Sequence, residues 1–284
     1  RVKDMQSMFE DCNYLETLDL SNFKTENVIE MKKMFRFCRR LTKLDISNFN
    51  TINVRSMDSM FNDCESITSL NLNHFHTSKV SNFEYMFERC ISLVSLDIST
   101  FDTSNAISLF AMFLGCSSLT SINLHSFVVT NAKNMESMFE GCESLSKLDL
   151  SNFETTNAVY MASMFKGCAK LSSLDISKFI TDNVMGMREM FYGCKRLISL
   201  SLSNFNTVSV TNMESMFQNM EQLKRLDISH FNLRRVTTTK SMFDGCFSLS
   251  SLSLSTSSTP LLNTMNEMFK DCEKLTSLDM TGFD

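Results

Sequence analysis

Apolar residues return at one fixed interval along the whole chain. The dipeptide Met-Phe occurs eleven times, from Met8-Phe9 to Met268-Phe269, and each occurrence lies 26 residues after the one before. A repeat length of about 20 to 50 residues is typical of solenoids, in which each unit buries its apolar face against its neighbours. The interval therefore predicts one elongated array in place of separate globular domains.

Two apolar periodicities are joined in each unit. Between residues 31 and 54 the pattern is M-x-x-M-F-x-x-C-x-x-L-x-x-L-x-L-x-x-F-x-T-x-x-V. From Val28 to Cys38 the apolar residues lie three and four apart, which predicts a short helix of about ten residues with one apolar face. Leu44 and Ile46 then alternate with polar residues, which predicts a strand.

The residue before the repeated Cys predicts where the helix ends. Glycine or asparagine, which accept a left-handed backbone, occupy this position in six units. Phe37 and Arg89 occupy it in two others, so we do not expect a left-handed residue in every unit. A recurring threonine before each predicted helix is either a helix cap or a partner for backbone groups of the loop, and the sequence leaves both open. It is found at Thr25, Thr51, Thr77, Thr103, Thr155, Thr181 and Thr207.

The widths of the two elements predict a curved array. Neighbouring strands lie about 4.8 Å apart, whereas packed helices need about 8 to 10 Å. We therefore expect an α/β, curved leucine-rich-repeat solenoid of eleven 26-residue units, with short parallel strands on the concave side and short helices on the convex side. Residues 1–284 are expected to form this single solenoid, as a fragment that lacks its capping units.

The repeat resembles the 26-residue subclass of BspA-like leucine-rich repeats, which occur in bacterial surface proteins and in mycoplasma lipoproteins. Residues 135–153, which read M-E-S-M-F-E-G-C-E-S-L-S-K-L-D-L-S-N-F, carry the resemblance most clearly, and it extends over essentially all 284 residues. It implies a right-handed solenoid used for adhesion or protein binding, often outside the cell. It implies no catalytic residues and no cofactor.

Composition and cysteine spacing narrow the chemistry further. A net charge of −5 gives no reason to expect a nucleic acid partner, and no apolar run approaches the roughly 18 residues of a membrane span. The ten cysteines occur one per unit, and the ninth unit has Met220 at this position instead. Because methionine can replace cysteine at a buried apolar site but not in a disulfide, the pattern favours buried free thiols over disulfides. Zinc ligands normally come in close pairs, which are absent here, and no catalytic motif is present. Free thiols are compatible with a surface or secreted protein and also with a cytoplasmic scaffold, so the cysteines do not fix the location.

An acidic column is the first candidate for partner binding. The residue between the two strand leucines is Asp in most units, and the next outward residue is usually Ser. The column offers either an acidic strip for a basic protein or calcium, or side chains that satisfy backbone groups beside the strand, and we favour the second interpretation. Its candidate binding residues are Asp45, Asp97, Asp149 and Asp175.

Irregular units between residues 220 and 262 are the second candidate. Leu233 replaces the repeated Thr there, Thr239 replaces the first Met, and Ser257 interrupts the phenylalanine column. A contact site and drift toward the end of the array remain equal alternatives. The basic residues of this region are Lys224, Arg225, Arg234, Arg235 and Lys240.

These patterns lead to a functional hypothesis and an alternative. The leading hypothesis is a non-enzymatic protein-binding or adhesion solenoid, at the cell surface or secreted, whose partner is a host or self surface protein. The alternative is a structural subunit that packs into a larger assembly. Exposed apolar residues at positions that are polar in other units would favour assembly, and Phe110, Leu114 and Phe247 are the candidates.

Overall fold

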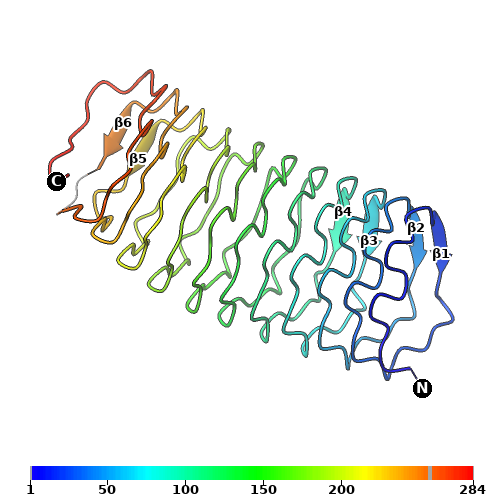
Figure 1. The fold of residues 1–284 in the computed structure, drawn as a ribbon. Helices are drawn as coiled ribbons and strands as arrows, with labels where there is room; N and C mark the ends of the chain where they lie inside the picture. The colour runs from blue at the N-terminus through cyan, green and yellow to red at the C-terminus, as the bar shows by residue number, and fades with distance from the viewer. Residues whose placement is uncertain (1, 255–257, 284) are drawn as a thin grey trace.

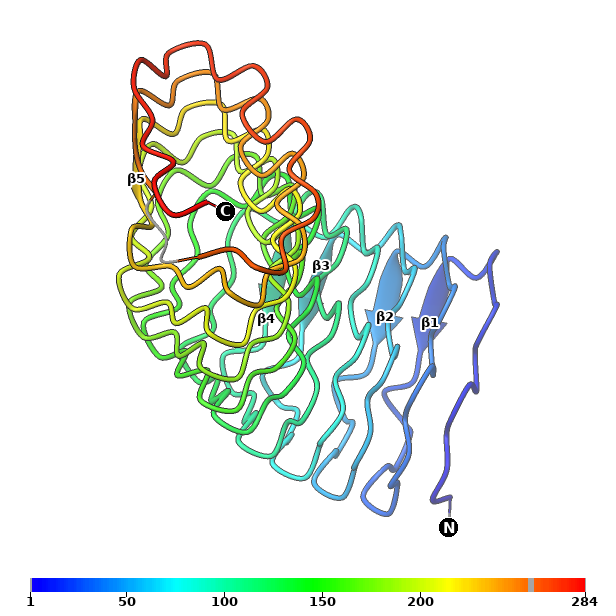
Figure 2. The same ribbon diagram turned by 60° about the vertical axis from the view of Figure 1, so that its left-hand side comes forward.

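The protein is a stack of similar coils arranged in chain order, with the two ends of the chain at opposite ends of the stack (Figure 1). The computed structural model describes residues 2–254 and 258–283. Turning the molecule by 60° shows that the stack also bends and twists along its length (Figure 2). The predicted solenoid is therefore confirmed, whereas the Ser257 position lies outside the described residues.

Short strands form one side of the coils. The strands pair in parallel, β1 with β2, β3 with β4 and β5 with β6, and equivalent residues of neighbouring coils lie opposite each other. The central leucine of each strand packs toward the core and the residues on either side of it face outward. The bounds are β1 (Thr17–Asp19), β2 (Lys43–Asp45), β3 (Ser69–Asn71), β4 (Ser95–Asp97), β5 (Arg225–Asp227) and β6 (Ser251–Ser253).

A second parallel ladder runs along another side of the stack. Single bridges connect each coil to the next, starting with Asp4 to Glu30 and ending with Thr238 to Thr264. Backbone groups next to the bridges also bond from coil to coil, and the Arg55 N–H, for example, donates to the Ile29 carbonyl at 2.9 Å. Coils are thus hydrogen-bonded to their neighbours on two sides.

The predicted helices are wrong, because residues 2–254 and 258–283 contain no helix. Successive tight turns occupy each predicted helical segment. Within a coil, the N–H groups of Met8, Glu10 and Cys12 donate to the carbonyls of Met5, Ser7 and Phe9, and each bond closes a four-residue turn. The alternate N–H groups donate along the stack, and that of Ser7 donates to the Lys32 carbonyl of the next coil at 3.0 Å. Turns reproduce the apolar spacing of three and four, so periodicity alone did not separate them from a helix.

Left-handed residues make these turns possible. The position before the Cys has a positive φ in all eleven coils, including 61° at Phe37 and 56° at Arg89, so our expectation of exceptions was wrong. The residue before each Met-Phe is left-handed as well, as at Ser7 with φ of 57°, although none of these residues is glycine. A left-handed residue breaks a helix, and its own N–H donates to the next coil, as at Ser7 and Phe37.

One coil spacing therefore applies on the turn side as well as on the strand side. The phenylalanines of the Met-Phe pairs form an unbroken stack from Phe9 to Phe269, with ring centroids 5.4 to 5.9 Å apart. We expected wide helices and narrow strands to bend the array, with strands on the concave side and helices on the convex side. Since the described residues form no helix, this difference in width between the two sides is absent. The α/β class is accordingly replaced by strands and turns.

The recurring threonines connect neighbouring coils and do not cap helices. The buried Thr25 hydroxyl donates to the Asn50 carbonyl at 3.0 Å and accepts the Asn50 N–H at 2.7 Å. The same pair of bonds recurs at each of the other predicted threonines. Where Val129 stands instead, the Glu154 N–H turns to the carbonyl of Asn152 in its own coil. The loop interpretation of the threonines is the one that applies.

The ten cysteines are free thiols, as expected, and eight of them are fully buried. Each thiol from Cys38 onward donates to the carbonyl of a phenylalanine in the preceding coil, for example Cys142 to Phe113 at 3.2 Å. Burial raises the pKa of the Cys142 thiol to about 12, because the charged thiolate would lose its hydration. The column is therefore an unreactive part of the core.

We predict that Phe139→Ala lowers the free energy of unfolding by about 3 to 5 kcal/mol, because the ring is fully buried and stacks on Phe113 and Phe165. Urea denaturation followed by circular dichroism measures the change. Phe247→Ala is the matched control, since that ring is 38% exposed and Ala169 occupies the equivalent position. An unchanged midpoint for Phe139→Ala would contradict the stacked core.

The thiols give a second prediction. Iodoacetamide near neutral pH should leave Cys116 and Cys142 unmodified in the folded protein, because their thiols are buried and their raised pKa values suppress the reactive thiolate. Both should react once urea unfolds the chain. Peptide mass spectrometry measures the labelling, and cysteines that fail to react in denaturant would point to disulfides instead.

Candidate partner-binding surface

The predicted aspartates lie in one column on the outward side of the strands. Asp45 ends β2 and Asp97 ends β4, and Asp149 and Asp175 occupy the same position in later coils. Their carboxylates lie at the surface, exposed at Asp45, Asp149 and Asp175 and half-buried at Asp97. The structure thus places these four candidates on one face, spaced by whole coils.

Each aspartate accepts a hydrogen bond in a tight turn, which follows β2 at Asp45 and β4 at Asp97 and recurs at Asp149 and Asp175. An Asp149 oxygen accepts the Ser151 N–H at 3.0 Å, and the Asp175 carboxylate binds Ser177 in the same way. At Asp97 the hydroxyl of Ser99 also donates, at 2.7 Å. These bonds favour the charged form and lower the pKa of Asp97, Asp149 and Asp175. The turn geometry supports the structural interpretation of the Asp-Ser pairs.

Shallow hollows lie between neighbouring strands on this face. One has a volume of about 510 Å³ and spans β2 and β3, and its lining includes Leu44 and Leu70 at the base. Its polar lining consists of Asp45, Ser47, Ser69, Asn71, Asn73 and His74. The strand face therefore offers small polar groups above a partly apolar floor, in a groove that crosses coils.

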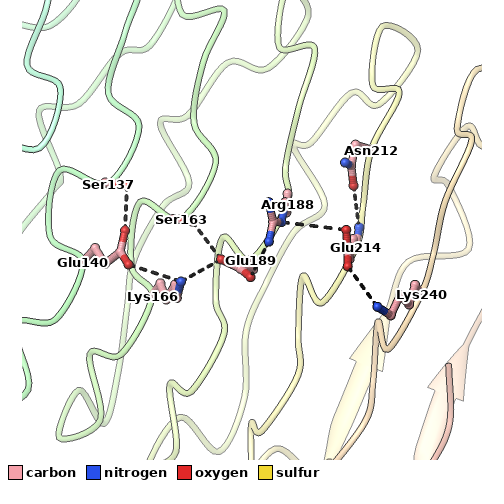
Figure 3. A network of polar contacts seen from close by, with 9 residues as sticks. All are labelled: Ser137, Glu140, Ser163, Lys166, Arg188, Glu189, Asn212, Glu214 and Lys240. Carbon is pink, nitrogen blue, oxygen red and sulfur yellow. Dashed lines mark hydrogen bonds and ion pairs between the residues drawn. The ribbon is translucent and has the colours of Figure 1, made fainter. Parts of the chain in front are cut away.

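The five predicted basic residues do not form one patch. Lys224 and Arg225 lie at the start of β5, and Arg234 and Arg235 lie in the loop that follows the phenylalanine column. Lys240 lies on the turn side, where its ammonium is 3.7 Å from a Glu214 oxygen (Figure 3). The structure therefore separates the proposed contact site into three places around the coil.

A charged network on the turn side was not predicted. Lys166 binds Glu140 at 3.2 Å and Glu189 at 2.8 Å, and Arg188 connects Glu189 with Glu214 (Figure 3). Burial opposes ionisation of Glu189, but its cationic partners lower its pKa below the usual value. A signal was present in the sequence, because Glu140 and Lys166, and likewise Glu214 and Lys240, are opposite charges 26 residues apart.

Metal-ligand groups and membrane-spanning helices are both absent from the described part of the chain. In residues 2–254 and 258–283, no group of three or more His, Cys, Asp and Glu side chains is arranged to hold a metal ion. The same residues include no helix that is long and apolar enough to cross a membrane.

The turn role of the aspartates can be separated from their charge. Asp149→Asn should leave thermal stability nearly unchanged, because Asn123 accepts the equivalent His125 N–H at 3.1 Å in the neighbouring coil. Asp149→Ala should lower the melting temperature, since the Ser151 N–H loses its acceptor. Differential scanning calorimetry compares the two variants. Equal melting temperatures for Asn and Ala would contradict the turn role.

Comparisons with known proteins agree with this architecture. A leucine-rich repeat protein from Bacteroides ovatus is 19% identical with a TM-score of 0.55, and the match covers 98% of this chain and 70% of that one. A leucine-rich cell surface protein from Faecalibacterium prausnitzii is 16% identical with a TM-score of 0.47, and the match covers 98% of this chain and 76% of that one. No curated protein matches the chain. At such identities the first match shows a shared leucine-rich-repeat fold.

A protein-family model matches the sequence over residues 1–93, 65–179 and 159–283. Together with the shared fold, this match confirms the resemblance to BspA-like leucine-rich repeats of the mycoplasma type. The chain belongs to the family described as "Mycoplasma protein of unknown function, DUF285".

Proposed function

We propose that this chain is a non-catalytic binding solenoid, displayed on or secreted from the cell, that holds a protein partner on the outward face of its strands. The observation that carries the proposal is a face on which short polar side chains recur at the same positions of successive coils, including the paired strands β1 with β2, β3 with β4 and β5 with β6. A rigid extended array of this kind loses little freedom when a partner binds. The location follows the surface proteins that the repeat resembles.

The chemistry of the face favours a partner with basic and hydrogen-bonding groups. Aspartates recur along the column, and the outward position that begins each strand is mostly Ser or Thr. Lys43, Lys147 and Arg225 interrupt that position, which divides the acidic column into separate segments. A partner would thus be positioned along the stack by charge as well as by shape.

The strand-face proposal predicts that a bulky cation in the middle of the array blocks binding. Ser95→Arg should reduce retention of the partner about tenfold or more, because the new side chain projects over β4 and repels basic groups. The fold should tolerate the change, since Lys43, Lys147 and Arg225 occupy equivalent positions. The measurement is quantitative mass spectrometry of surface proteins that the immobilised chain retains.

Ala162→Arg on the turn side is the matched control, because Lys32, Arg188 and Lys240 occupy the equivalent positions of other coils. Equal retention by wild type and by Ser95→Arg would contradict the strand face as the binding surface. Light scattering tests the alternative of a structural subunit. A stable oligomer of the purified chain would favour assembly over partner binding.

A further inference from the structure

One coil carries two large apolar side chains on the turn side where other coils carry charged or polar ones. Phe110 shares its position with Asp58 and Glu84 of preceding coils and with Glu136 of the next, and Leu114 likewise lies between Glu88 and Glu140. Both side chains are half-buried and face outward from the turns. The coil therefore places an apolar spot inside an acidic surrounding.

Backbone and ring contacts hold this arrangement together. The Tyr85 N–H donates to the Phe110 carbonyl at 2.9 Å, and the Ala111 N–H donates to Glu136 at 2.9 Å, so these residues lie in consecutive coils. The Tyr85 and Phe110 rings meet edge to face with centroids 5.0 Å apart. Beside Tyr85 lies a hollow of about 440 Å³, also lined by Lys33, Arg36, Asp58, Ser59, Asn62 and Glu88.

Four carboxylates surround this apolar spot. Asp58 and Glu88 line the hollow beside Tyr85, Glu84 precedes Tyr85 in the chain, and Glu136 lies in the coil next to Phe110. Burial, and then the charges of these four carboxylates, raise the pKa of Tyr85. Burial raises the pKa of Asp58, Glu88 and Glu136, because their charged forms are partly removed from water. We call these four carboxylates, with Tyr85, Phe110 and Leu114, the acidic turn patch.

The chain itself leaves most of these charges unmatched. Within residues 2–254 and 258–283, the carboxylates of Asp58, Glu84 and Glu136 have no ion-pair or hydrogen-bond partner, and Glu88 accepts only from the Asn62 amide at 2.7 Å. Three neighbouring cations are bound to other carboxylates, Arg36 to Glu10, Arg89 to Asp63 and Lys166 to Glu140 and Glu189. Lys33 lies in the hollow with Asp58, and its charge acts on that carboxylate.

We propose that the acidic turn patch is a second docking surface, and that it binds a peptide segment of a partner protein in which an apolar side chain is flanked by lysine or arginine. The apolar side chain would pack on Phe110 and Leu114, and the flanking cations would pair with Glu84 and Glu136 on either side. Charge complementarity selects this occupant, because Glu84 and Glu136 flank the apolar spot in the neighbouring coils and neither has an ion-pair partner among residues 2–254 and 258–283. The patch lies on the turn side, so this inference stands apart from the strand-face proposal.

A library of random peptides displayed on phage tests the inference, with the intact chain as the immobilised target. We expect enrichment of peptides that carry an apolar side chain between Lys or Arg. Fluorescence anisotropy then measures the affinity of the enriched peptides as synthetic probes. Glu84→Gln combined with Glu136→Gln should weaken binding roughly two- to thirtyfold, and added salt should weaken it further. Phe110→Ala should weaken it about thirtyfold.

The first control uses residues that the repeat already accepts. Ala162 occupies the Phe110 position in a later coil, and Gln218 occupies the Leu114 position, so Phe110→Ala and Leu114→Gln should keep the wild-type circular dichroism spectrum. Glu26→Gln combined with Glu154→Gln removes the same charge from exposed positions outside both proposed binding surfaces and should leave peptide affinity unchanged.

Three results would overturn the inference. They are the absence of any enriched peptide, enrichment of neutral or acidic peptides, and equal affinity for wild type and the Glu84→Gln, Glu136→Gln variant. An oligomer that this variant converts to a monomer would also overturn it, because the occupant would then be a second copy of the chain.

Discussion

A single distance between neighbouring coils controls this structure. Strands, bridges and turns all bond to the next coil, and the phenylalanine rings between them stack at 5.4 to 5.9 Å. A helix uses its own N–H groups internally and needs about 8 to 10 Å between its axis and that of its neighbour. Left-handed residues in each turn avoid this conflict, because they direct alternate N–H groups toward the next coil. The absence of helices in the described residues is thus a consequence of the spacing.

The sequence predicted the array, its core and its free thiols, because each depends on residues that repeat at a fixed interval. It failed on the turn segment, since Met31, Met34, Phe35 and Cys38 face inward equally well from successive turns or from a helix. The left-handed conformation of the serines before Met-Phe could not be predicted, because serine occurs in many backbone conformations. The aspartate column was placed correctly, but its turn bonds needed atomic positions.

Charges 26 residues apart were visible in the sequence, but their meaning depended on the backbone. If each segment were a helix, equivalent residues such as Glu140 and Lys166 would lie on axes about 8 to 10 Å apart. In this stack the two side chains are 3.2 Å apart, and the same closeness leaves Glu84 and Glu136 on either side of Phe110. The basic residues from Lys224 to Lys240 are close in sequence, but they lie at different places around one coil and so form no patch. A surface patch on this protein is therefore formed by residues about 26 positions apart in consecutive coils, and not by residues that are close in sequence.

The threonine ladder also limits how such a chain can change in evolution. Every Thr hydroxyl must meet both the N–H and the carbonyl of one residue located 25 positions later. A single inserted or deleted residue would misalign that contact together with the thiol contact 29 positions apart on the opposite side of the coil. Lengthening by whole coils preserves both. Unequal recombination between identical 26-residue segments is thus the tolerated route to longer or shorter relatives, whose reach would differ in steps of one coil.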